Sequence, residues 1–366
     1  MFAGITASVL MLLYQRPASP VKRLAPASDG QVPERRALSQ DLVGTVGVLA
    51  SFSILAGVAG ARHGIGTDYV LRYVPLFENI AGGWHVETEY GFRLLTEAVA
   101  AFTDDYRWFF AVTSVLTVGL VYRFILRLSF HPALSVFVYV FGGFYLESFN
   151  LTQQALAIAI VLNTIEFALK RKVVPFVVIT LLAATVHSSA LLWLLVWPFV
   201  STRRGPRTQM IRMVALGLGV LFLPATLGAI ATRWAPEYAW YFQSDYGFVR
   251  SFDPGSVVIA GSLLVLSLLV RGPSNATRYR TSVLGLQGLQ IVTLIASLTI
   301  AYAYTRVAYY FTPIQMLALP MVLAFIRDAR IRAVVAAALV LLYVAAFYYK
   351  FVVWNAHGVL PYESVF

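Results

Sequence analysis

Residues 43–60, VGTVGVLASFSILAGVAG, form an apolar run that is followed directly by the polar stretch ARHGIGTDYVLRY at residues 61–73. The run is close to the ~20 residues that an α-helix needs to cross the ~30 Å hydrocarbon core of a bilayer. After it, Gly64 and Gly66 allow the backbone to turn sharply. The pattern predicts a membrane-spanning helix that ends in a loop rich in arginine, histidine, aspartate and tyrosine.

The composition extends this prediction to the whole chain. Of the 366 residues, 59% are hydrophobic and only 12% are charged, whereas a soluble protein has about 25% charged residues. The absence of cysteine excludes disulfides, thiol chemistry and cysteine-ligated metals. We expect an all-α polytopic membrane protein that forms one integral membrane domain over residues 1–366.

Hydrophobic runs predict about twelve transmembrane helices. They lie near residues 2–14, 42–60, 106–122, 130–146, 151–169, 173–186, 188–200, 212–232, 255–270, 281–303, 308–326 and 333–350. Residues 15–41, which contain proline, alanine and arginine, are expected to form a flexible linker. Two larger loops are expected at residues 61–105 and 233–254, the first of them with a helix around residues 89–101.

Positive charge alternates between the predicted loops. Most lysines and arginines fall in one set, made up of residues 15–41, 123–129, 170–172, 201–212, 271–280 and 327–332. The positive-inside rule puts this set in the cytoplasm. The loops at 61–105 and 233–254 and both chain termini then lie on the extracytoplasmic side, together with most of the carboxylates. The net charge of +11 is explained by this asymmetry, so we expect no nucleic-acid partner.

The polar side chains that are unusual for a membrane protein fall on the predicted outer side. They are Arg62, Asp68, Glu89, Gln153, Gln154, His187 and Arg306. His187 lies between the short segments 173–186 and 188–200, and about 14 helical residues span only about 21 Å. Because this is less than the hydrocarbon thickness, we expect His187 in a cavity below the outer surface.

Each of these side chains also has a structural interpretation when it is taken alone. An arginine can anchor a helix at the membrane interface, and a glutamate can stabilise a helix N-terminus. The aromatic residues of 234–246 are typical of an interfacial belt. The chain shows no metal-ligand spacing, no Walker motif and no dinucleotide fingerprint, so we expect neither a metal nor a cofactor.

The order of several short motifs resembles the EpsG-type, Wzy-like polysaccharide polymerases of bacteria. The motifs are Arg62-x3-Gly66-Thr67-Asp68-Tyr69-x3-Tyr73, Glu89-x-Gly91-Phe92, Gln154-x2-Ala157, Lys170-Arg171-Lys172, His187-Ser188-Ser189-Ala190, and Arg306 with Tyr309 and Tyr310. They extend over residues ~42 to ~326. One position departs from the pattern, because Gln153 stands where similar proteins usually carry an arginine. Arg250 is a candidate for the missing positive charge.

The resemblance implies a glycan polymerase that acts on the extracytoplasmic side of the bacterial inner membrane. It would transfer a chain from undecaprenyl diphosphate to a sugar hydroxyl of the next lipid-linked repeat unit. Diphosphate would be bound by Arg62, Arg306 and Arg250, because arginine clamps stabilise a leaving group that accumulates negative charge. The expected contacts to glycan are Tyr69, Tyr73, Glu89, Gln153, Gln154 and Tyr310. Two groups, His187 and Asp68, could deprotonate the acceptor hydroxyl, and the ordinary pKa of histidine favours His187.

Two other functions remain open at this point. A polyprenyl-phosphate-sugar-dependent glycosyltransferase would add single sugars, and a flippase would move lipid-linked glycan across the membrane without chemistry. A flippase needs polar groups along a path accessible from both faces, whereas the unusual groups here gather on one side. A chain-length regulator and a flippase of the same pathway are expected partners by family analogy alone.

Overall fold

Every predicted span that falls on described residues is helical, although some, such as 130–146, are divided between two helices. The computed structural model describes residues 38–201, 254–299 and 303–365, and a few isolated positions between 208 and 233. Within these ranges each regular element is a helix, and the one extended pairing is an isolated bridge between Arg62 and Ser364. The all-α class is therefore confirmed for this part of the chain. The predicted spans at 2–14 and 212–232, the linker up to residue 37 and the loop at 233–254 lie outside it, apart from isolated positions. Residues 38–41 were expected in the linker, but they form the start of the helix Leu38–Gly60.

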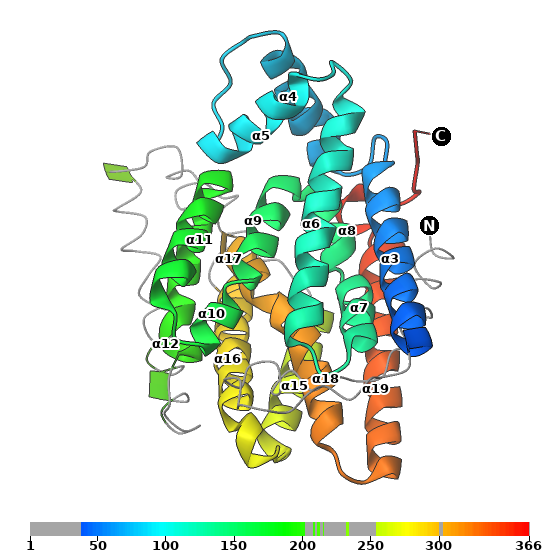
Figure 1. The fold of residues 1–366 in the computed structure, drawn as a ribbon, viewed down its shortest axis with the longest axis vertical. Helices are drawn as coiled ribbons and strands as arrows, with labels where there is room; N and C mark the ends of the chain where they lie inside the picture. The colour runs from blue at the N-terminus through cyan, green and yellow to red at the C-terminus, as the bar shows by residue number, and fades with distance from the viewer. Residues whose placement is uncertain are drawn as a thin grey trace. The chain divides into compact units, whose positions relative to one another are not determined.

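The first of two units contains residues 1–194 and 343–366. Its helices are α3 (Leu38–Gly60), the π-helix η1 (Tyr69–Tyr73), α4 (Val74–Ala81), α5 (Tyr90–Ala100), α6 (Tyr106–Leu128), α7 (Pro132–Phe141), α8 (Phe144–Asn150), α9 (Thr152–Leu162), α10 (Ile165–Leu169) and α11 (Val173–Val186) (Figure 1). The 3₁₀-helix η2 (Ser188–Val196) begins in this unit, and the π-helix η6 (Tyr348–Val353) and the 3₁₀-helix η7 (Ala356–Gly358) complete it. The helix expected around residues 89–101 is confirmed as α5.

The second unit contains residues 195–342. Its described helices are α12 (Trp197–Val200), η4 (Ser274–Ala276), α15 (Pro254–Leu269), α16 (Thr277–Thr299), α17 (Ala303–Phe311), η5 (Thr312–Ile314), α18 (Gln315–Phe325) and most of α19 (Ala329–Phe347). Ala260, Leu294 and Ala308 form a buried apolar cluster where α15, α16 and α17 pack together.

Four described helical segments are long and apolar enough to cross a membrane. They are Tyr106–Leu128, Thr152–Leu169, Thr305–Phe325 and Ala329–Val353. A fifth is added if α7 and α8 count as one span bent by 47°. Shorter apolar helices cover Gly44–Gly60, Val173–Val186, Ser188–Val200 and Gly255–Leu269. The described residues thus belong to a helical membrane protein, and the number of twelve spans stays a prediction.

Two glycines explain the bend between α7 and α8. Gly143 has a φ of +91°, which side chains other than glycine rarely adopt. A Cβ at Gly142 would lie 2.5 Å from the carbonyl oxygen of Val138, so this position also requires glycine. At the end of the second half of the bent pair, the side chain of Asn150 accepts a hydrogen bond of 2.9 Å from the backbone N–H of Asp68.

The C-terminal tail packs on the polar loop that follows α3. Three backbone hydrogen bonds of 2.9, 3.0 and 3.3 Å join residues 61–66 to residues 358–365. The hydroxyl of Tyr362 also donates to the carbonyl oxygen of Val58 at 2.7 Å. The tail and the first large loop therefore lie at the same end of this unit, as expected for two segments on one side of a membrane.

Candidate functional site

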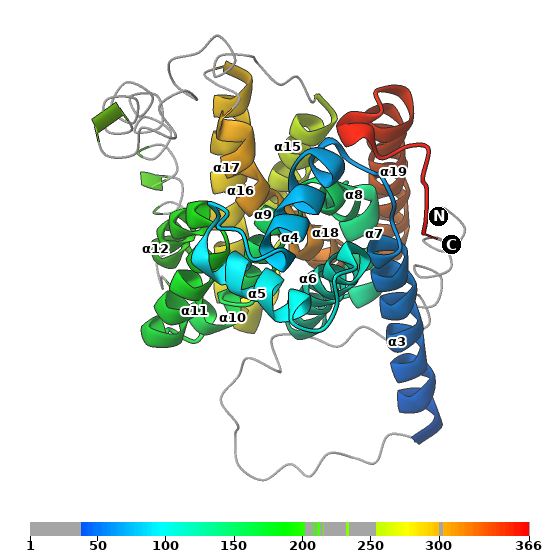
Figure 2. The same cartoon turned by 90° about the horizontal axis from the view of Figure 1, so that it is seen from above.

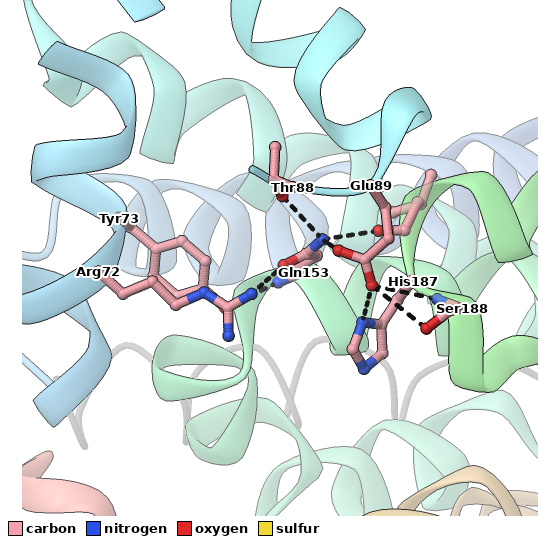
Figure 3. A network of polar contacts seen from close by, with 8 residues as sticks. Arg72, Tyr73, Thr88, Glu89, Gln153, His187 and Ser188 are labelled. Atoms are coloured by element: carbon pink, nitrogen blue, oxygen red, sulfur yellow. Dashed lines mark hydrogen bonds and ion pairs between the residues drawn. The ribbon is translucent and has the colours of Figure 1, made fainter. Parts of the chain in front are cut away.

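Four side chains from four different elements form a continuous polar chain at the loop end of the first unit (Figure 3). Nδ1 of His187 lies 2.9 Å from Oε1 of Glu89, and Nε2 of Gln153 donates to Oε2 of Glu89 at 2.5 Å. Arg72 donates to Oε1 of Gln153 at 2.8 Å. The order Arg72–Gln153–Glu89–His187 links a guanidinium to an imidazole through an amide and a carboxylate.

His187 is positioned by the end of α11. The helix ends here because His187 has an extended backbone, with φ −152° and ψ 116°. The next residue, Ser188, donates its backbone N–H to Oε1 of Glu89 at 3.2 Å and so holds the same carboxylate oxygen as His187. The imidazole is half-buried, with 23% of its side chain exposed. The cavity expected around it stays a prediction.

Glu89 occupies the N-cap position of α5 with an extended backbone, φ −62° and ψ 137°. A close contact of α5 with α11 brings it to His187. At Gly91, a Cβ would lie 2.3 Å from Oγ1 of Thr185 and 3.0 Å from its carbonyl carbon. Only glycine allows the two backbones to approach this closely. The second half of the Glu89-x-Gly91-Phe92 motif has a structural role as well, because Phe92 is fully buried against Phe109 of α6.

The carboxylate of Glu89 is held in its ionised form. Burial alone would raise the pKa of Glu89, but the hydrogen bond and charge of His187 and the backbone N–H groups of Glu89 and Ser188 outweigh burial and lower the pKa to about 2. An ionised carboxylate only accepts hydrogen bonds, so Nδ1 of His187 must carry the proton in this contact. In a neutral imidazole the lone pair then lies on Nε2, which points away from Glu89 (Figure 3).

Gln153 lies in the first turn of α9, and its neighbours determine which way its amide points. Arg72 can only donate and the carboxylate of Glu89 can only accept, so the amide oxygen must face Arg72 and the amide nitrogen must face Glu89. The nitrogen also donates to the carbonyl oxygen of Val186 at 2.9 Å. Gln153 therefore connects the arginine to the acid–histidine pair without adding charge.

Arg72 supplies a positive charge next to Gln153. It lies on η1, where it is exposed to solvent, and its guanidinium lies 5.7 Å from the ring centre of Tyr73. Among the described residues, Gln153 is the hydrogen-bond partner of one terminal nitrogen of Arg72, and the guanidinium has further N–H groups that can donate to a ligand. The expectation that Arg250 replaces the missing arginine falls on a residue outside the described ranges.

Arg62 is buried rather than exposed in the loop. It is 2% exposed, and its guanidinium donates to Ser114 at 2.9 Å, to Thr152 at 3.0 Å and to the carbonyl oxygen of Ala59. Burial lowers the pKa of Arg62 to about 10. These contacts join α3, α6 and α9, so in this conformation Arg62 holds three helices together and does not reach solvent. Its expected contact with diphosphate stays a prediction.

Neutral groups surround Arg62. The guanidinium lies 4.7 Å from the ring centre of Phe110 and 5.2 Å from that of Phe149. Burial raises the pKa of Tyr69 to about 12, so this nearby phenol stays protonated and supplies no counter-charge. Cation–π contacts and hydroxyl acceptors therefore stabilise this buried cation in the described part of the chain.

The other expected site residues are distributed around this network. Tyr69 is buried and stacks on Phe110 with ring centres 4.1 Å apart. The hydroxyl of Tyr73, also buried, accepts from the backbone N–H of Gln153 at 3.2 Å. Asp68 is half-buried at the start of η1, and Gln154 is buried on α9. Their sugar contacts stay predictions.

Two expected residues belong to the second unit. Arg306 and Tyr310 both lie on α17, where Arg306 is half-buried and Tyr310 is fully buried. The polar chain from Arg72 to His187 lies wholly within the first unit. The expected contacts of Arg306 with diphosphate and of Tyr310 with glycan stay predictions.

Sequence reasoning did not assign a role to Arg72 or to Asn150. Arg72 was visible in the polar stretch 61–73, and the departure at Gln153 was the signal that a second cation should be near. Asn150 accepts from Thr67 at 3.1 Å, and its amide nitrogen lies 3.3 Å from Nδ1 of His357. It thus ties the loop to the C-terminal tail, a contact between residues 207 positions apart that no local pattern indicates.

A family model described as the EpsG family matches residues 46–364, which is most of the chain. No curated protein and no solved structure matches the chain. The matched region includes every residue of the polar chain from Arg72 to His187.

Proposed function

We propose, from the premise that the chain belongs to the EpsG family, that it is a glycan polymerase acting on polyprenyl-diphosphate-linked substrates. The family implies a polysaccharide-polymerase-like membrane protein. The observation that supports the polymerase reaction is the half-buried pair of Glu89 and His187, which Gln153 connects to the guanidinium of the exposed residue Arg72. A base and a phosphate-binding cation are the two groups that the reaction needs.

The transfer step uses His187 as the general base. A hydroxyl oxygen of the acceptor sugar attacks the anomeric carbon of the donor chain, and the bond from this carbon to the diphosphate oxygen breaks. The hydroxyl proton passes to Nε2 of His187, and undecaprenyl diphosphate leaves with the bonding electrons. Glu89 keeps the other ring nitrogen protonated and stabilises the imidazolium that forms. Asp68 remains a candidate for binding a sugar hydroxyl.

Arg72 binds the diphosphate in this proposal, together with the arginines expected from the sequence. A guanidinium can hold two phosphate oxygens with parallel hydrogen bonds, whereas an ammonium is a single point of charge. The hydrogen bond to Gln153 fixes the orientation of Arg72 before substrate arrives. Arg62 contributes by fixing α3, α6 and α9 around the site.

Replacing Arg72 by lysine is expected to reduce the rate of glycan transfer roughly 10- to 100-fold. This factor corresponds to the loss of one charge-assisted hydrogen bond to the leaving group. The rate would be measured with purified enzyme and lipid-linked repeat units. Arg93→Lys is the matched control, because Arg93 lies in the same loop and pairs with Glu97 outside the network. Equal rates for the Arg72 and Arg93 variants would show that Arg72 does not bind the leaving group.

The overall activity is tested by the lipid-linked glycans of a deletion strain. A missing polymerase leaves single repeat units on the lipid carrier, and restoring the gene restores a ladder of longer chains. A single-sugar glycosyltransferase would instead leave repeat units that lack one sugar, and a flippase would leave complete units on the cytoplasmic side. The polymerase reaction calls for a flippase that delivers repeat units and for a regulator of chain length as partners.

The proposed site faces the extracytoplasmic side, in a chain that crosses the bacterial inner membrane twelve times. Contacts between residues 61–66 and the C-terminal tail support this arrangement because they place both segments at one end of the first unit. Arg123 and Lys170, from two loops of the predicted cytoplasmic set, likewise pair with the same carboxylate, Glu166.

Single cysteines test this topology, because the chain has none of its own. Cysteines at Thr103 and Ser244 are expected to react with a membrane-impermeant maleimide added to intact cells, whereas cysteines at Ser28 and Ser201 are expected to react only after lysis. Labelling of Ser201→Cys in intact cells would contradict the proposed orientation of the site.

A further inference from the structure

The helix that carries Glu89 exposes a second apolar face. Its buried side consists of Phe92, Thr96 and Val99. At 3.6 residues per turn, the opposite side carries Tyr90, Leu94, Ala98 and Ala101, all of which are exposed. Tyr90 is 74% exposed and Leu94 is 52% exposed. A helix in water would have polar residues on this face.

Charged side chains of α5 lie along one edge of this apolar face. Arg93 and Glu97 form an ion pair of 2.7 Å one turn apart on the helix, and His85 lies 2.8 Å from Arg93. This arrangement of an apolar stripe with a charged margin is typical of helices that lie in the plane of a membrane surface.

The two ends of α5 lie near the ends of two apolar helices, α11 and α6 (Figure 2). Near its N-terminus, Gly91 contacts Thr185 at the end of α11, whose exposed residues Val178 and Leu182 are apolar. Beyond its C-terminus the chain enters the candidate span α6, on which Trp108 is 59% exposed. A tryptophan in the first turn of a span marks the boundary between lipid and water.

We propose that the outer face of α5, together with Phe102 and Trp108, binds the lipid bilayer at the boundary between headgroups and acyl chains. Phe102 is 90% exposed in the connection from α5 to α6 and adds a large apolar side chain at the C-terminal end of α5. The eleven residues of α5 extend about 16 Å, parallel to the membrane surface. We assign lipid as the occupant because α5 lies between two apolar helices, α11 and α6, whose residues Val178, Leu182 and Trp108 are exposed.

This placement also has a consequence for substrate access, which rests on the proposed function. Glu89 is the N-cap of α5, so a helix at headgroup depth holds the Glu89–His187 pair at that depth too. The diphosphate of a polyprenyl-linked glycan lies at the same level. Substrate can then reach the site by lateral movement in the membrane.

Spin labels on single cysteines test the membrane contact without any activity measurement. Full-length protein in liposomes of phosphatidylethanolamine and phosphatidylglycerol would carry the label at Leu94 or Ala98. The matched control is Glu97→Cys, on the charged margin of the same helix. Val178→Cys serves as the lipid reference and Asp104→Cys as the water reference, because both positions are exposed in the structure.

The measured quantity is the collision rate of each label with oxygen and with a water-soluble nickel chelate. At Leu94 and Ala98 we expect the collision rate with oxygen to exceed that with the nickel chelate, as at Val178. At Glu97 and Asp104 we expect the collision rate with the nickel chelate to be the higher of the two. Nickel accessibility at Leu94 and Ala98 equal to that at Asp104 would place the face in water and overturn the proposal. Low accessibility to both reagents would show that protein, such as a second copy of the chain, covers it, which also overturns it. The proposed reaction is unaffected by either result.

Discussion

Replacement of His187 by alanine is expected to slow glycan transfer by about 10²- to 10⁴-fold, the usual contribution of a general base. The reason is the pairing of Nδ1 with Glu89 at 2.9 Å, which leaves the lone pair on Nε2 for the acceptor hydroxyl. Binding of the lipid-linked substrate should persist, because the proposed phosphate contact involves Arg72 and not His187. The measurement is a single-turnover rate with saturating donor and acceptor, alongside a binding assay with donor alone.

The control for this experiment is His85→Ala. His85 is an exposed histidine of the same loop and contacts Arg93 outside the network, so its loss should leave the rate near that of the wild type. Asp68→Asn distinguishes the second candidate base. If His187→Ala keeps the wild-type rate while Asp68→Asn has none, the base is Asp68 and His187 has a packing role.

Glu89→Gln tests the role of the carboxylate separately from that of the imidazole. The amide keeps a hydrogen-bond acceptor for Nδ1 but removes the negative charge that stabilises the imidazolium, so we expect a rate between those of the wild type and His187→Ala. Because the pKa of Glu89 is about 2, the wild-type carboxylate stays ionised at any pH near neutrality. A loss of wild-type activity between pH 7 and pH 5 therefore cannot come from protonation of Glu89.

The helices could be predicted from the sequence because they depend on local apolar runs. The run at 43–60 became the greater part of α3, and residues 61–68 turn after it, as the glycines at 64 and 66 indicated, whereas Tyr69–Tyr73, also expected in the loop, fold as η1. For Glu89 and His187, the sequence predicted only that both residues lie on the same side of the membrane, and it did not predict their contact. The two residues are 98 positions apart, and their contact depends on how α5 crosses α11.

The burial of Arg62 had no sequence signal for a related reason. An arginine just after a span is normally an interfacial anchor or a ligand contact, since both places offer water or an anion. Here the C-terminal tail pairs with the loop, and Ser114 and Thr152 come from two distant helices to accept its hydrogen bonds. Likewise, η1 is a π-helix, and nothing in its residues predicts the turn that brings Arg72 to Gln153.

Replacement of Gly91 by alanine is expected to reduce the rate of glycan transfer by about 10²-fold, the loss that a displacement of about 1 Å can cause in an active site. The added Cβ would meet Oγ1 of Thr185 at 2.3 Å and its carbonyl carbon at 3.0 Å, so α5 must move away from α11. Glu89, two residues earlier, would move away from His187 with it. The same overpacking should lower the free energy of unfolding by about 1–3 kcal/mol.

Gly57→Ala is the matched control for this substitution. Gly57 is an exposed glycine within α3, and a Cβ there meets no atom within 4 Å, so activity should not change. Helix propensity alone would make alanine more favourable than glycine by about 1 kcal/mol, and a loss at Gly91 therefore cannot come from propensity.

Adding Thr185→Ala to Gly91→Ala removes the closest contact but leaves the backbone contact at 3.0 Å. We expect this pair to recover part of the rate, and the double-mutant cycle to show coupling. Should Gly91→Ala be as active as Gly57→Ala, the approach of α5 to α11 does not position Glu89, and the acid–histidine pair loses its structural basis.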